Sequence, residues 1–180
     1  PFAGAQYHGI WHLASPASPP LYKQRRRETL RLGATVTDLL LTIAQQHGAR
    51  MLFASSSEVY GDPSVVPTPE GHRGHVSSTG PRSCYDEGKR AGEAVCAAWA
   101  YESDVDVRIA RIHNTYGPGQ VPDGRLMPAL IYAVLTGTVP RIDGDGAQTR
   151  SVCYVDDTIA GLWAVWELGA RATPINVGGD

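Results

Sequence analysis

The chain has 180 residues, 42% of them hydrophobic and 19% charged, and its formal net charge at pH 7 is −2. That length suffices for one globular domain or slightly more, and the near-neutral charge argues against a nucleic-acid partner. No apolar run can span a bilayer, so no membrane partner is expected, and no signal-peptide pattern opens the chain. Three cysteines without CxxC spacing favour a reducing, cytoplasmic location, and no HExxH-like pair predicts a metal site.

Segments with strand and helix patterns alternate along the chain. Strands are predicted over 9–14, 49–56, 105–112 and from 175 onward, and helices over 28–47, 85–102, 125–136 and 158–168. A proline-rich loop (15–20) follows the first strand, and a loop rich in proline and glycine (61–82) follows the second. We expect Gly48 and Gly137 to end their helices, and Asp156 and Asp157 to cap the last helix.

This alternation predicts an α/β fold with a Rossmann-like, doubly wound parallel sheet and right-handed crossovers. In such sheets, ligands bind at the carboxyl ends of the strands. Ser55, Ser56, Ser57 and Glu58 stand where the second predicted strand ends, so we expect them beside a ligand. The alternative is a serine-rich strand exit whose hydroxyls only satisfy loop amides.

Tyr85 and Lys89 are spaced i, i+4 near the start of a predicted helix, so their side chains share one face. An ammonium group beside a phenol is expected to lower the phenol pKa. Such a tyrosine can take a proton from an alcohol while a hydride leaves the same carbon, and the lysine can hold a ribose diol. The alternative is a solvated helix pair without chemistry.

Six blocks, in this order and spacing, resemble one group of enzymes: "HLASPASPP", "SSSEVYGDP", "GPRSCYDEGKR", "RIHNTYGP", "DGR" and "QTRSVCYVDD". The group is UDP-glucuronate decarboxylase (UDP-xylose synthase), within the extended short-chain dehydrogenases and the NAD-dependent epimerase/dehydratase family. The spacing YxxxK is typical of the superfamily. Ser57-Glu58 is similar to the decarboxylases, because the related 4,6-dehydratases carry Asp-Glu there and 4-epimerases usually carry no acid at the glutamate position.

The resemblance implies NAD-dependent decarboxylation of UDP-glucuronate to UDP-xylose through a 4-keto intermediate. Tyr85, helped by Lys89 and Ser56, would oxidise C4 of the sugar, and Ser57 and Glu58 would serve the loss of CO2 and the protonation of C5. Some relatives release the 4-keto pentose instead of reducing it. The alternatives are another nucleotide-sugar 4,6-dehydratase or 4-epimerase, or a catalytically inactive homologue that binds sugar nucleotides.

The resemblance also implies binding residues and a partner. The residues implied for NAD are Leu13, Ala14, Ser15, Ser55, Tyr85 and Lys89, and those implied for the UDP-sugar are Tyr22, Asn114, Arg125 and Arg150. A loop-capping role is the alternative for Asn114, and a surface position is the alternative for each arginine. A homodimer is expected through the helices over 28–47 and 85–102.

The chain departs from the family pattern at both ends and at two internal places. No GxxGxxG turn for the NAD pyrophosphate is present, and the family's arginine for the sugar carboxylate lies beyond the last residue, so we expect the middle of a longer protein. We therefore expect residues 1–118 to form an NAD-binding core that lacks its N-terminal βαβ unit. Residues 119–150 would belong to a smaller substrate domain, and residues 151–180 would hold a return helix and the start of a strand of that domain. Gly33 and Val36 replace a family asparagine and glycine, and His113 replaces a common phenylalanine.

Overall fold

A four-stranded, all-parallel sheet forms the centre of the fold. The computed structural model describes residues 4–140, 142, 144–147 and 149–179. The strands are β1 (Gly9–His12), β2 (Arg50–Ser56), β3 (Val107–Ile112) and β6 (Pro174–Val177), in the order β1-β2-β3-β6. This arrangement confirms the predicted α/β class, with the first and third strands two residues shorter than expected.

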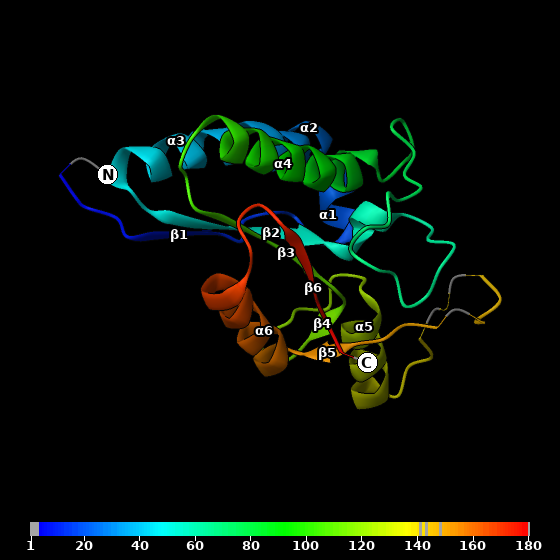
Figure 1. The fold of residues 1–180 in the computed structure, drawn as a ribbon. Coiled ribbons are helices and arrows are strands. Elements are labelled where there is room, and N and C mark those ends of the chain that lie inside the picture. The colour runs from blue at the N-terminus through cyan, green and yellow to red at the C-terminus, as the bar shows by residue number, and fades with distance from the viewer. Residues whose placement is uncertain (1–3, 141, 143, 148, 180) are drawn as a thin grey trace.

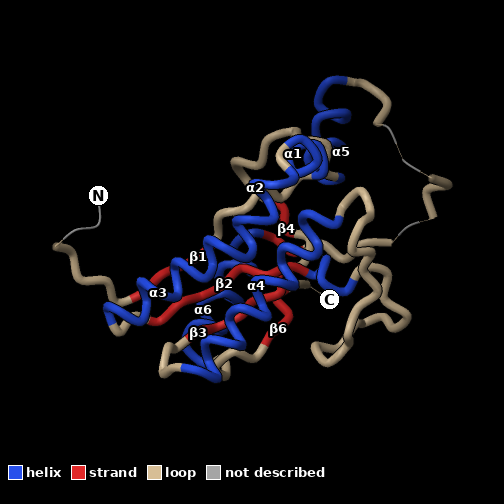
Figure 2. Tube along the Cα trace, turned by 90° about the horizontal axis from the view of Figure 1, so that it is seen from above, coloured by secondary structure: helices blue, strands red, loops and turns tan. Residues whose placement is uncertain are grey.

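Helices cover both faces of this sheet, as a doubly wound fold requires. On one face lie α2 (Arg26–Arg31), α3 (Thr37–His47) and α4 (Ser83–Glu102), and on the opposite face lies α6 (Val155–Leu168) (Figure 1). Seen from above, α3 and α4 run side by side over the strands (Figure 2). In the described part of the chain, no helix has the length and apolar character needed to cross a membrane.

A smaller layer lies near the carboxyl ends of the strands. It contains α5 (Leu126–Thr136) and a two-stranded parallel ladder of β4 (Thr115–Tyr116) and β5 (Cys153–Tyr154) (Figure 1). The boundaries at 118 and 150 stay a prediction, and residues 1–3, 141, 143, 148 and 180 of the predicted segments lie outside the described residues.

The strand β2 is buried on both faces, as its continuous apolar run predicts. Alternate side chains enter two cores. Met51 and Phe53 pack on the α3 and α4 side with Leu41, Cys96 and Ile109. On the α6 side, a second cluster gathers around the same strand: Leu52, Ala110, Leu162, Val165 and Val177. The carboxyl end of β2 is therefore held rigidly from both sides.

The long helix predicted over 28–47 begins at Arg26 and contains a π-helical stretch, Leu32–Val36, between α2 and α3. Thr37 Oγ1 donates to the Gly33 carbonyl at 2.7 Å within this stretch. A Cβ atom at Gly33 would lie 2.1 Å from the carbonyl oxygen of Gly88 on α4. Glycine at position 33 therefore lets the two helix backbones approach, whatever role the family asparagine has there. At the other end, Gly48 ends α3 in the left-handed conformation, as predicted (φ 61°).

Two sequence predictions about helix starts were wrong. Pro19 and Pro20, predicted to lie in a loop, begin the short helix α1 (Pro19–Gln24), because the first helical positions need no backbone N–H donor. Asp156 and Asp157 do not cap α6, since that helix starts at Val155 and both carboxylates stand in its first turn. There they oppose the positive end of the helix dipole instead of accepting a cap hydrogen bond.

Candidate active site

A cleft of about 400 Å³ lies at the carboxyl ends of β2 and β3, between the starts of α1, α4 and α5. Twelve of the thirteen predicted site residues line it: Leu13, Ser15, Tyr22, Ser55, Ser56, Ser57, Glu58, Tyr85, Lys89, Asn114, Arg125 and Arg150. Ala14 is the exception, and its side chain is exposed to solvent. The topology thus brings together residues from seven separate stretches of sequence.

Tyr85 lies in the first turn of α4 and is buried against the strand exit. Its phenol shares a hydrogen bond with the hydroxyl of Ser56. The Ser56 hydroxyl also accepts from the backbone N–H of Glu58 at 3.3 Å, which caps the 3₁₀ turn Ser57–Tyr60 that follows β2. From α1, the Tyr22 ring stacks on the Tyr85 ring at 5.2 Å between centroids. The Tyr85 phenol is therefore fixed from two sides.

Burial sets the acid–base properties of the pair. It raises the pKa of Tyr85 above its ordinary value, although the Ser56 hydrogen bond acts in the opposite direction. It also lowers the pKa of Lys89 to about 8. Lys89 Nζ donates to the Ala54 carbonyl at 2.7 Å and lies 5.7 Å from the Tyr85 ring centroid. The prediction that Lys89 brings the Tyr85 pKa below its ordinary value is therefore wrong for the protein by itself, because desolvation of the phenolate outweighs any attraction by the ammonium group.

An acidic cluster flanks Tyr85 on its other side. Glu58 forms an ion pair with Arg82, whose Nε lies 3.7 Å from Asp86 Oδ2. Burial raises the pKa of Asp86 to about 6, and its Oδ1 has no hydrogen-bond partner among the described residues. Sequence reasoning missed Arg82 and Asp86, although both lie in the block "GPRSCYDEGKR", three residues before Tyr85 and one after it.

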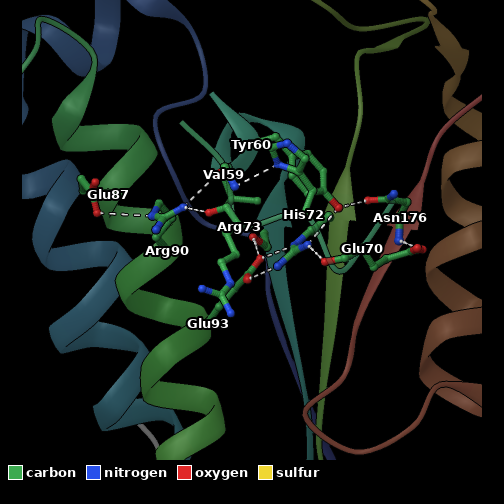
Figure 3. A network of polar contacts seen from close by, with 12 residues as sticks. Val59, Tyr60, Glu70, His72, Arg73, Glu87, Arg90, Glu93 and Asn176 are labelled. Atoms are coloured by element: carbon green, nitrogen blue, oxygen red, sulfur yellow. Dashed lines mark hydrogen bonds and ion pairs between the residues drawn. The ribbon is translucent and has the colours of Figure 1, made fainter. Parts of the chain in front are cut away.

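A buried polar network supports the strand exits from below. Arg111 at the end of β3 donates from Nε and Nη2 to both carboxylate oxygens of Glu93 on α4, at 2.9 and 2.7 Å. Its Nη1 donates to the Tyr60 hydroxyl at 2.8 Å, and Tyr60 donates to Asn176 of β6 (Figure 3). The Ser55 hydroxyl donates to Glu93 at 2.5 Å, so it serves this network even though Ser55 lines the cleft.

The outer wall of the cleft carries two arginines and an asparagine. Arg125 pairs with Asp123 at 2.7 Å just before α5, and Arg150 donates to the carbonyl of Thr149 at 3.2 Å. The backbone carbonyl of Asn114 accepts from Cys153 at 2.8 Å, which joins the end of β3 to β5. Both guanidinium groups therefore belong to the cleft wall, and both arginines come from segments of the chain that follow β3.

The chain matches the model of the NAD dependent epimerase/dehydratase family over residues 2–178. It is 46% identical over 170 residues to UDP-glucuronic acid decarboxylase 1 of Xenopus tropicalis, covering 94% of this chain and 40% of that protein. It is 44% identical to UDP-glucuronic acid decarboxylase 5 of Arabidopsis thaliana, covering 94% of this chain and 50% of that protein. The chain thus spans half or less of the length of these two curated relatives.

Solved structures show the same fold. The dTDP-glucose 4,6-dehydratase DesIV of Streptomyces venezuelae, crystallised with NAD and TYD, superposes with a TM-score of 0.84 at 28% identity, over 96% of this chain and 52% of DesIV. A UDP-N-acetylglucosamine 4-epimerase of Methanobrevibacter ruminantium also gives 0.84 at 26% identity, over 95% of this chain and 55% of that structure. By its fold and by the matched family model, the chain belongs to the NAD-dependent epimerase/dehydratase family.

Proposed function

We propose that this chain supplies the catalytic strand exit of an NAD-dependent UDP-glucuronate decarboxylase that forms UDP-xylose through a 4-keto intermediate. The observation that carries the proposal is a single cleft in which Tyr85 contacts Ser56, with Lys89 on one side and the pair of Glu58 and Arg82 on the other. The names of relatives that are 43–46% identical support the choice of substrate.

The cleft lining fits the ribose and nicotinamide end of a dinucleotide. Lys89 offers a buried ammonium group with donors beyond the one that Ala54 accepts, next to the polar Tyr85 and the wall formed by Leu13 and Ser15. Leu13, Ser15 and Lys89 would hold NAD at this end, and the cofactor would supply the acceptor and donor for the hydride of the sugar C4. No glycine-rich turn of this chain fits the pyrophosphate, so the proposal assigns only the nicotinamide end to these residues.

The oxidation step uses Tyr85 as the base for the sugar 4-hydroxyl, with Ser56 hydrogen-bonded to the phenol and Lys89 nearby. The product is a β-keto acid, which loses CO2 because the electron pair of the breaking bond delocalises onto the C4 oxygen. Tyr85, now protonated, donates a hydrogen bond to that enolate oxygen. Burial raises the pKa of this phenol in the protein alone, so its role as the base requires the positive charge of Lys89 or of a bound ligand beside it to favour the phenolate. C5 then takes a proton from a water that Ser57 and Glu58 orient.

Two further properties belong to the proposal. A homodimer would form through the outer faces of α3 and α4, where Leu39 and Tyr101 leave 57% and 92% of their surface exposed. A reducing, cytoplasmic location is supported by Cys84, Cys96 and Cys153, which are all buried and free. Light scattering of the purified protein tests the dimer, and a monomer at micromolar concentration would refute it.

The test is turnover by the purified protein, expressed at its full natural length. Incubation with UDP-glucuronate is expected to release CO2 and a UDP-pentose, and Tyr85→Phe is expected to abolish this while UDP binding persists. Tyr132→Phe is the matched control, because Tyr132 is exposed on α5 and does not line the cleft. Turnover of another UDP- or dTDP-sugar without CO2 would favour a 4,6-dehydratase or 4-epimerase instead.

A further inference from the structure

Two carboxylates share one guanidinium group at the edge of the cleft. Arg82, the residue that precedes α4, pairs with Glu58 from the 3₁₀ turn and approaches Asp86 from α4. The exposed fractions of the side chains are 43% for Arg82, 35% for Glu58 and 11% for Asp86. Asp86 is therefore the buried anchor of the cluster, and the Arg82–Glu58 pair is the part that a ligand can reach.

The other cations of the cleft are engaged elsewhere. Lys89 bonds the Ala54 carbonyl, Arg125 pairs with Asp123, and Arg150 bonds the carbonyl of Thr149. In the described part of the chain, Arg82 is the one cation within ion-pair distance of Glu58. The remaining titratable groups that face the cluster carry no positive charge: Tyr22 from α1, and Cys84, Tyr85 and Glu87 from α4.

The proposed substrate adds a third carboxylate to this place, because the C4 carbon at Tyr85 is bonded to C5, which carries the acid. Without Arg82, the carboxylates of Glu58 and Asp86 would face that acid without a cation between them. Like charges that lie close together repel strongly where water is partly excluded. With Arg82 present, Glu58 is neutralised.

We propose that Arg82 is a specificity-determining residue of this site. By neutralising Glu58, Arg82 allows a carboxylate-bearing sugar to bind, and Asp86 positions the Arg82 guanidinium group. This inference rests on the proposed function, since it assigns the substrate's carboxylate to the edge that Glu58 occupies. It separates the substrate, UDP-glucuronate, from the product, UDP-xylose, which has the same nucleotide and the same ring hydroxyls but no carboxylate.

The measured quantity is the ratio of the two affinities, obtained by calorimetry with the full-length protein in a Tyr85→Phe background that prevents turnover. Arg82→Gln is expected to weaken UDP-glucuronate binding by roughly tenfold relative to UDP-xylose binding. Arg82→Lys keeps the charge and is expected to restore part of the ratio. Arg90→Gln is the matched control, because Arg90 pairs with Glu87 on the same helix (Figure 3), is 38% exposed and lies outside the cleft.

Two outcomes would overturn the inference. The first is an Arg82→Gln protein that binds both ligands equally more weakly, as a merely structural role predicts. The second outcome concerns Glu58→Gln, which replaces Arg82→Gln if that variant does not fold. Because Glu58→Gln removes the charge that Arg82 neutralises, the affinity ratio must shift in favour of UDP-glucuronate over UDP-xylose. An unchanged affinity ratio contradicts the proposal. Failure of the proposed function is recognised separately, because it appears as a wild-type protein that releases no CO2.

Discussion

The crossing of the π-helical stretch and α4 yields a sharp prediction about stability. In Gly33→Ala, the new Cβ would lie 2.1 Å from the Gly88 carbonyl oxygen, whereas ordinary contact begins at 3.4 Å. The two backbones would have to separate by about 1.3 Å, the difference between these distances. Overpacking of a rigid contact costs about 1–3 kcal/mol, and the upper end applies because both partners are backbone. We expect a net loss of roughly 2 kcal/mol, the upper end of that cost less a gain of about 1 kcal/mol in helix propensity.

The assay is urea unfolding followed by circular dichroism, in which this loss corresponds to a midpoint lower by roughly 1 M. Gly88→Ala is the control on the same crossing, because its Cβ would meet Leu30 and Thr29 atoms no closer than 3.6 Å. That variant should be as stable as the wild type or up to about 1 kcal/mol more stable. Equal midpoints for Gly33→Ala and wild type would refute the close approach of the two backbones.

Three further predictions concern buried charges. Arg111→Met leaves Glu93 buried without its partner and should cost about 3–5 kcal/mol in urea unfolding, much of which a second change, Glu93→Met, should recover. The pKa of Asp86 rises from 3.8 to about 6 on folding, so the wild-type protein loses free energy of unfolding as the pH rises through this window. The free energy of unfolding of Asp86→Asn, relative to wild type, should therefore increase by about 3 kcal/mol between pH 4 and pH 7 in urea unfolding. The pKa of Lys89 falls from 10.5 to about 8, so stability is lost as the pH falls through this window; Lys89→Met should be more stable than wild type at pH 7, and the difference should shrink towards pH 10.

The fold was predictable because its signals are local and repeated. The run over 49–56 is apolar on both faces, which is typical of a central parallel strand, and Gly48 stands where a helix must end. The π-helical stretch was not predictable, because hydrophobic spacing at 3.6 residues per turn tolerates one extra residue without a visible break. The helical start at Pro19 was missed because proline was interpreted as a helix breaker, although it fits a first turn.

The candidate site was predictable where residues share one element or one strand exit. Tyr85 and Lys89 are one helical turn apart, and Ser56 ends a strand, so their positions follow from geometry alone. The pairing of Arg82 with Glu58 was not predictable from local pattern, because it depends on how the loop over 61–82 returns to the sheet. The direction of the Tyr85 pKa was missed for a related reason, since burial is a property of the tertiary packing.

Several groups that cost free energy in the protein alone lie at the same place as its candidate chemistry. Lys89 is a buried cation, Asp86 a buried carboxyl with one unpartnered oxygen, and Tyr22 a buried phenol whose hydroxyl has no partner among the described residues. Each of these groups costs free energy in the protein alone. The close crossing at Gly33 and the packed core around β2 hold α4 in place against that cost. A ligand that bonds these groups would therefore stabilise the fold as it binds, because it satisfies polar atoms that the protein leaves unpaired.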